Sequence, residues 1–92
     1  MALESALVRK INKLCAESDV WNLNIKDHNL NGTPDRLLLT RDGRYIWLEV
    51  KREDLTGTVS PIQKYRHSEL RSFKAEVYVV DNIEQVKEIL CL

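Results

Sequence analysis

The chain has 92 residues, of which 43% are hydrophobic and 30% are charged, and its formal net charge at pH 7 is zero. This length supplies one modest hydrophobic core, so we expect residues 1–92 to form a single domain. No apolar run reaches the roughly 18 residues that a membrane-spanning helix needs, and the first residues lack the pattern of a signal peptide. The sequence therefore predicts a cytoplasmic protein without a membrane partner.

The first elements are a helix and a strand. Residues 2–17 place Leu7, Ile11 and Leu14 at helical spacing, which predicts an amphipathic helix. Residues 20–26, "VWNLNIK", alternate apolar and polar side chains, which is the period of a half-buried strand.

Two further strands are expected at residues 35–41 and 44–51, after a turn-rich connector. Both are largely apolar, and they meet at Asp42-Gly43, a strong short-range signal for a hairpin. The two strands are therefore expected to be antiparallel.

The remainder of the chain predicts a helix, a strand and a closing helix. Ser60-Pro61 matches an N-cap followed by proline at the first helical position, and this helix should run to about Lys74. Residues 75–81 read as a strand and residues 83–90 as a helix. The order is α-β-β-β-α-β-α. Because a helix separates the last two strands, they are expected to be parallel neighbours, which gives an α/β fold with a mixed four-stranded sheet flanked by helices.

Three charged residues, Asp35, Glu49 and Lys51, interrupt the most apolar strands. An unpaired buried carboxylate costs several kcal/mol, so a central strand keeps one only with a partner, a metal ion or a cleft. The grouping suggests a functional site. The alternative is an exposed strand end where Lys51 forms a surface ion pair with a carboxylate.

The hairpin loop decides whether the two carboxylates meet. With a two-residue loop at Asp42-Gly43, Asp35 would pair with Val50 and face away from Glu49. A three-residue loop, a type I turn followed by a left-handed glycine, places Asp35 opposite Glu49. We predict the three-residue loop or an equivalent bulge.

Two carboxylates that face each other can share one hard cation. Magnesium or manganese suits such oxygen ligands, with water and phosphate completing the coordination. The metal would activate water for attack on a phosphodiester. Lys51, on the same face as Glu49, could orient that water or stabilise the charge that develops on phosphorus.

Pro34-Asp35, thirteen intervening residues and Glu49-Val50-Lys51 resemble the PD-(D/E)xK motif of restriction-endonuclease-like nucleases. The wider string "GTPDRLLL…DGRYIWLEVKRE…GTVSPIQKY" resembles the VRR-Nuc family, the virus-type replication-repair nuclease domain. The resemblance spans nearly the whole chain. It implies a restriction-endonuclease-like fold and a metal-dependent DNA endonuclease in a bacterium or a phage-infected host cell.

Matched position by position, the resemblance implies metal ligation by Asp35, Glu49 and the Val50 carbonyl, and catalytic roles for Lys51, Gln63 and Glu4. Spacing alone favours a different role for Gln63, as the partner of Ser60 in a capping box. For Glu4, the alternative is a first-turn residue stabilised by the helix dipole.

Residues 26–74 hold ten Lys/Arg against seven Asp/Glu, which suits a polyanionic partner. Four cations there are candidate phosphate contacts, although each also suits a solvated surface: Lys26, Arg36, Arg52 and Lys64. His28 and His67 lack metal-ligand spacing, and we assign neither a catalytic role.

The resemblance to small VRR-Nuc proteins implies a structure-specific DNA endonuclease that cuts branched DNA, such as four-way (Holliday) junctions, as a homodimer whose two-fold symmetry matches the junction. Tyr65, Phe73 and Trp21 are candidates for the dimer interface. The alternatives are a flap, end-processing or nicking nuclease, a DNA-binding module without catalysis, and a plain interaction domain.

Overall fold

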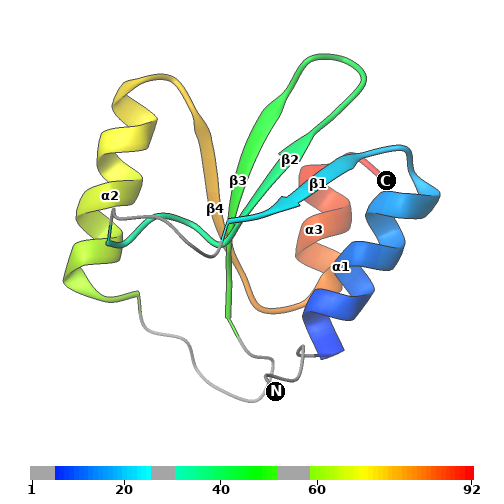
Figure 1. Cartoon of the computed structure of the whole chain (residues 1–92), viewed down its shortest axis with the longest axis horizontal. Helices are drawn as coiled ribbons and strands as arrows, with labels where there is room; N and C mark the ends of the chain where they lie inside the picture. The colour runs from blue at the N-terminus through cyan, green and yellow to red at the C-terminus, as the bar shows by residue number, and fades with distance from the viewer. Residues whose placement is uncertain (1–5, 26–30, 52–58) are drawn as a thin grey trace.

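A computed structural model describes residues 6–25, 31–51 and 59–92 (Figure 1). The elements are α1 (Ala6–Glu17), β1 (Trp21–Asn24), β2 (Arg36–Leu39), β3 (Tyr45–Val50), α2 (Pro61–Ser72), β4 (Glu76–Val80) and α3 (Ile83–Ile89). This order confirms the predicted one, although residues 2–5 of the expected first helix lie outside the described residues. In the described ranges, no helix combines the length and the apolar character needed to cross a membrane.

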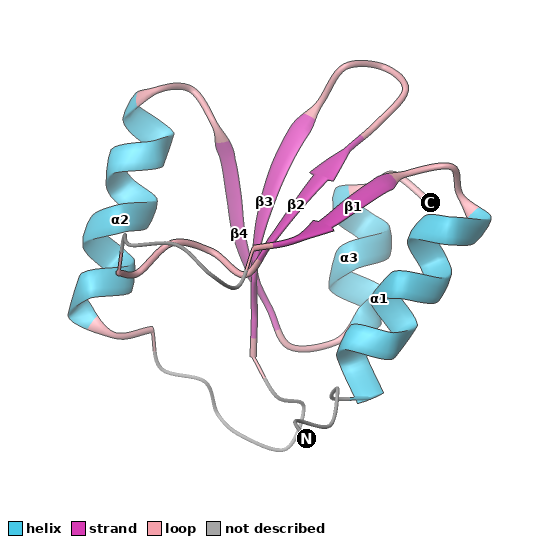
Figure 2. Cartoon of the chain, viewed as in Figure 1, coloured by secondary structure: helices cyan, strands magenta, loops and turns pink. Residues whose placement is uncertain are grey.

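The strands form one mixed sheet in the order β1-β2-β3-β4 (Figure 2). β2 is antiparallel to both of its neighbours, whereas β3 and β4 are parallel. The chain passes from β3 to β4 through α2, as expected for parallel neighbours that need a crossover. The prediction of a mixed sheet with two central apolar strands is confirmed.

The main core lies between one face of the sheet and the helices α1 and α3 (Figure 1). α1 buries Leu7, Ile11 and Cys15, which recur at one helical turn along a single stripe. The cluster comprises Leu7, Ile11, Cys15, Leu38, Ile46, Leu48, Val80, Val86 and Leu90. Burying each large aliphatic side chain stabilises the fold by about 1.5–3 kcal/mol.

α2 lies on the opposite side of the sheet, next to β4 (Figure 1). This helix is polar, and within it only His67 is buried. At its far end the Arg71 Nη2 donates a hydrogen bond to the Val77 carbonyl of β4 at 2.8 Å. α2 therefore packs on the sheet with hydrogen-bonding side chains as well as apolar contact, so this side of the sheet is suited to a polar site.

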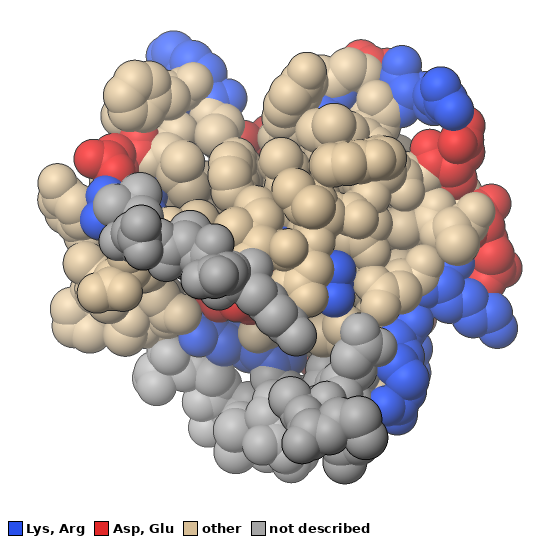
Figure 3. All heavy atoms as spheres, in the orientation of Figure 1, with Lys and Arg blue, Asp and Glu red and all other residues tan. Residues whose placement is uncertain are grey.

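Part of this second face stays open beyond α2. Trp21 pairs with Leu39, and Leu39 pairs with Tyr45, so the three side chains share one face. Trp21 is 54% exposed and Tyr45 63% exposed. On the face of the molecule that Figure 3 shows, the middle is largely uncharged, and most Lys and Arg side chains lie towards the edges.

The β2–β3 hairpin has the predicted three-residue loop, residues 41–43. The Gly43 N–H donates to the Thr40 carbonyl at 3.1 Å, and the Thr40 N–H donates to the Arg44 carbonyl at 3.1 Å. Gly43 has a φ of 88°, a left-handed conformation that glycine adopts without steric cost. This loop sets the pairing of every residue in the two strands.

Candidate active site

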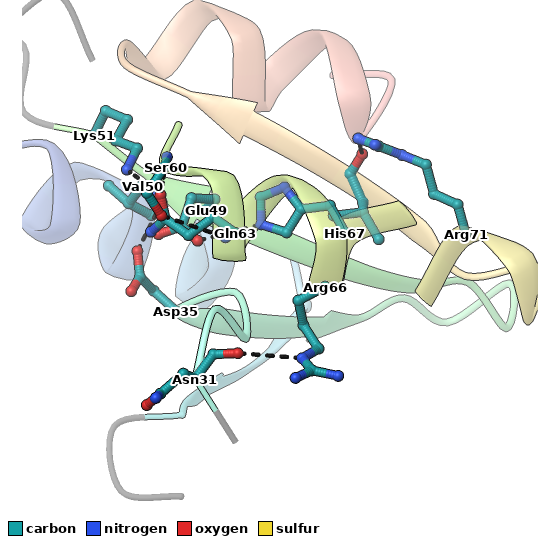
Figure 4. Close-up of polar contacts among 11 residues, drawn as sticks. Asn31, Asp35, Glu49, Val50, Lys51, Ser60, Gln63, Arg66, His67 and Arg71 are labelled. Atoms are coloured by element: carbon teal, nitrogen blue, oxygen red, sulfur yellow. Dashed lines mark hydrogen bonds and ion pairs between the residues drawn. The ribbon is translucent and has the colours of Figure 1, made fainter. Parts of the chain in front are cut away.

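The hairpin register brings Asp35 and Glu49 together. Arg36 pairs with Leu48, and the next step of the same register sets Asp35 opposite Glu49. The Asp35 Oδ2 accepts a hydrogen bond from the Val50 backbone N–H at 2.9 Å, which holds this carboxylate against β3 (Figure 4). The two carboxylates therefore lie on one face of the sheet.

The environment of Glu49 disfavours its negative charge. Its side chain is only 3% exposed. Burial is the largest effect and the neighbouring Asp35 carboxyl the next, and together they raise the pKa of Glu49 to about 8 against a smaller opposing effect of Lys51. Two adjacent carboxylates in a site with little water are stabilised when a cation binds between them, because the cation offsets both charges.

The donor set fits a hard divalent cation. Asp35 and Glu49 supply carboxylate oxygens, and the Val50 backbone is fixed beside them by its hydrogen bond to Asp35. Across residues 6–25, 31–51 and 59–92, no three His, Cys, Asp or Glu side chains form a complete metal cage. Magnesium sites commonly use one or two carboxylates, with water and phosphate oxygens filling the other positions, so the residues present fit Mg²⁺ or Mn²⁺.

Lys51 follows Glu49 by two positions and projects from the same face of the chain. Its Nζ donates a hydrogen bond to the Gln63 Oε1 at 3.1 Å. In the described part of the chain, Lys51 forms no ion pair with Asp35 or Glu49, so the surface ion pair considered from the sequence is not formed. The ammonium group is thus held beside Gln63, and its positive charge acts on Glu49 without direct contact.

Gln63 forms the capping box that its spacing favoured and also contacts Lys51, while its catalytic role stays a prediction. The Gln63 Oε1 accepts a hydrogen bond from the Ser60 backbone N–H at 3.0 Å, and the Gln63 backbone N–H donates to the Ser60 Oγ at 3.3 Å. The two bonds complete a capping box. The same Oε1 also accepts from Lys51. The first turn of α2 is thereby linked to the lysine that directly follows β3 (Figure 4).

His67 belongs to this cluster, although its spacing in the sequence indicated no catalytic role. Its Nε2 lies 3.3 Å from the Glu49 Oε1, and both side chains are 3% exposed. Burial, followed by the positive charges of Arg71 and Lys51, lowers the pKa of His67, so the ring is neutral near pH 7. The signal that could have identified it is its position one helical turn after Gln63, on the same side of α2.

A solved structure described as a VRR_NUC domain matches this chain with a TM-score of 0.77 and 21% sequence identity, over 95% of this chain and 96% of the other. The chain has the VRR_NUC fold. No protein-family model matches the sequence, and none of the curated proteins matches it either. The match confirms the fold class predicted for the sequence, with all seven elements in the expected order.

Within this VRR_NUC fold, the segment before β2 packs against the start of α2. The Asn31 carbonyl accepts a hydrogen bond from the Arg66 Nε at 3.1 Å. Gly32 has a φ of 83°, and a Cβ built on it would lie 2.5 Å from the Ile62 carbonyl oxygen, so only glycine fits there. Pro34 is fully buried and leads directly into Asp35. These contacts fix the path of the chain into the site.

The prediction that Arg36 contacts phosphate is wrong. Arg36 is 5% exposed and lies on the core side of the sheet, because neighbouring residues of a strand point to opposite faces. Its Nη1 donates to the Asn22 Oδ1 at 3.1 Å, and Asn22 in turn donates to Asn12 of α1 at 2.7 Å. This network joins the sheet to α1 and uses the Arg36 guanidinium inside the protein.

The other predicted positions are divided between exposed and undescribed residues. Lys64 is exposed on the first turn of α2, next to Gln63, and stays a candidate phosphate contact. Glu4, Lys26, Arg52 and His28 lie outside the described residues.

The raised pKa of Glu49 gives a pH prediction for the metal-free protein. Between its ordinary pKa of 4.5 and about 8, Glu49 keeps a proton in the folded state that it releases in the unfolded chain, so the stability contributed by this proton is lost as pH rises through about 8. We expect the melting temperature in EDTA to fall between about pH 6 and 9, and Glu49→Gln to reduce this fall. Thermal unfolding of both proteins at the two pH values measures it, and equal pH slopes would contradict the assignment.

Proposed function

We propose that this protein is a metal-dependent DNA endonuclease that uses Mg²⁺ or Mn²⁺. The observation that carries the proposal is the hairpin register that sets Asp35 opposite Glu49, with Lys51 on the same face and bonded to Gln63. The VRR_NUC fold supports it, because the matched structure is described as a nuclease domain. The PD-(D/E)xK pattern at Asp35, Glu49 and Lys51 supports the same reaction class.

The carboxylates of Asp35 and Glu49 and the carbonyl of Val50 would hold the metal. When bound there, Mg²⁺ or Mn²⁺ supplies Lewis-acid chemistry, which polarises a phosphate oxygen and lowers the pKa of water. Burial of Glu49 makes this site selective for a cation, since an ionised carboxylate without one is costly.

Lys51 provides the positive charge that acts on the substrate. The transition state of phosphodiester hydrolysis carries more negative charge at phosphorus than the ground state, so a fixed ammonium group stabilises the transition state more strongly. The hydrogen bond to Gln63 fixes that group in advance. Because Gln63 is itself held by the capping box of α2, Lys51 does not need to be ordered during the reaction.

We propose that the substrate is branched DNA, such as a four-way junction. The 92 residues contain no separate module for reading base edges, which favours recognition by shape. A homodimer would place two active sites on symmetric strands of a junction. A flap, end-processing or nicking nuclease is the second candidate, and a DNA-binding module without catalysis is disfavoured because Asp35, Glu49 and Lys51 are all present.

The dimer interface is proposed to use exposed apolar side chains. Trp21 shares the open sheet face with Tyr45, so the two form a continuous apolar surface with Leu39 between them. Tyr65 on α2 is 60% exposed, and Phe73 at the end of α2 is 78% exposed. Aromatic side chains of this kind are enriched in protein interfaces.

An assay of the purified protein on linear, flap, splayed and four-way DNA tests the proposal. We expect cleavage only when Mg²⁺ or Mn²⁺ is present, with paired symmetric cuts in the four-way junction. The matched control is Glu49→Gln prepared in the same way. Cleavage confined to flaps or ends would favour the second candidate. If no DNA substrate is cleaved in the presence of Mg²⁺ or Mn²⁺, the proposal is contradicted.

Light scattering at micromolar concentration tests the dimer. We expect twice the chain mass for the wild type and a shift towards the mass of one chain for Trp21→Ser, because this substitution removes apolar area from the open sheet face. A monomeric wild type that still cuts both strands of a junction in pairs would contradict the dimer.

A further inference from the structure

His67 and Glu49 form a contact that is shielded from water. Their side chains approach to 3.3 Å between Nε2 and Oε1, and each is 3% exposed. His67 is also the one buried residue of α2, whose other side chains are partly or fully exposed. The buried residue of α2 therefore contacts a carboxylate and does not pack in the apolar core.

The direction of the hydrogen bond follows from the chemistry of the two groups. When a cation is bound, Glu49 is ionised and its carboxylate can only accept hydrogen bonds, so the His67 tautomer that carries Nε2–H is the one that donates to it. This bond occupies one oxygen and restricts rotation of the carboxylate, which leaves the other oxygen for a cation. Because both side chains are buried, water has little access to replace the bond if the imidazole is removed.

The spacing of α2 matches that of β3. Gln63 and His67 are separated by one helical turn, and their partners Lys51 and Glu49 are two residues apart on one strand face. One helix thus holds two site residues of the strand (Figure 4). The next polar contact of α2, from Arg71 to the Val77 carbonyl, touches neither of them.

We propose that His67 is a positioning residue, which orients the Glu49 carboxylate for binding Mg²⁺ or Mn²⁺. This inference rests on the proposed function, because it assigns His67 a task in the same metal site. Groups that hydrogen-bond to metal ligands fix the orientation of those ligands, and losing one typically weakens metal affinity about 10- to 100-fold.

The test is a titration of the full-length protein with Mn²⁺, followed by calorimetry, for the wild type and a set of variants. His67→Phe keeps a ring of similar size without a donor, and we expect its Mn²⁺ affinity to fall about 10- to 100-fold. His67→Gln can place an amide N–H near the Nε2 position and should recover much of the affinity. His67→Asn places its N–H nearer the Nδ1 position and should not.

Arg71→Met is the matched control, because it removes a hydrogen bond between α2 and the sheet without touching Glu49. It should lower the melting temperature in EDTA while keeping Mn²⁺ affinity near that of the wild type. Wild-type Mn²⁺ affinity in His67→Phe would overturn the inference. The inference would also be overturned if His67→Phe and Arg71→Met had the same melting temperature and lost the same amount of Mn²⁺ affinity. A wild type that binds no Mn²⁺ would instead contradict the proposed function.

Discussion

Asp35→Asn and Glu49→Gln are each expected to reduce DNA cleavage by about 10³-fold or more while leaving DNA binding largely intact. Each substitution removes one negative charge from the proposed metal site and no contact with phosphate. A loss of about 4 kcal/mol of transition-state stabilisation corresponds to about 10³ in rate, and a metal ion contributes several kcal/mol. Single-turnover cleavage of a four-way junction measures the first effect, and gel mobility of the same DNA measures the second.

Glu84→Gln is the matched control for these variants. Glu84 is 78% exposed on α3, on the other side of the sheet, so the same chemical change there should leave cleavage unchanged. Cleavage near the wild-type rate in either Asp35→Asn or Glu49→Gln would remove that carboxylate from the active site.

Lys51→Ala is expected to lower the rate of the chemical step by about 10²- to 10³-fold with Mn²⁺ affinity retained. The ammonium group stabilises charge that develops in the transition state, and removing one such preorganised group typically has an effect of this size. The hydrogen bond from Lys51 to Gln63 is lost as well, but the capping box that holds Gln63 stays. Single-turnover cleavage at saturating metal, together with an Mn²⁺ titration, separates the two properties.

Lys13→Ala, on the exposed face of α1, controls for the loss of a positive charge elsewhere on the molecule. If Lys51→Ala lost Mn²⁺ affinity but cleaved at the wild-type rate once metal was saturating, Lys51 would act on the metal site and not on the transition state.

The hairpin could be predicted in detail because its geometry is local. Gly43 adopts a left-handed conformation without steric cost, and common three-residue hairpin loops require this conformation at their last position. That loop alone decides whether Asp35 faces Glu49, so the main feature of the site followed from a few neighbouring residues. The parallel pairing of β3 with β4 followed in the same way from the helix between them.

Other features depended on contacts between distant segments. The partner of His67 is set by how α2 packs on β3, and no local pattern near His67 encodes that packing. Gln63 shows the same limit, since its capping box is local but its bond to Lys51 is not. Arg36 is different: its position beside Asp35 already places it on the opposite face of the strand, so this correction was available from strand alternation.

The central claim is that Asp35 and Glu49 form a binding site for a divalent cation. Anomalous diffraction from crystals of the protein grown or soaked with Mn²⁺ tests it most directly. The proposal predicts a single strong anomalous peak bounded by these two carboxylates and the Val50 carbonyl, and its loss in crystals of Glu49→Gln. A peak elsewhere, or none at this position when Mn²⁺ is in excess, would contradict the proposed metal site.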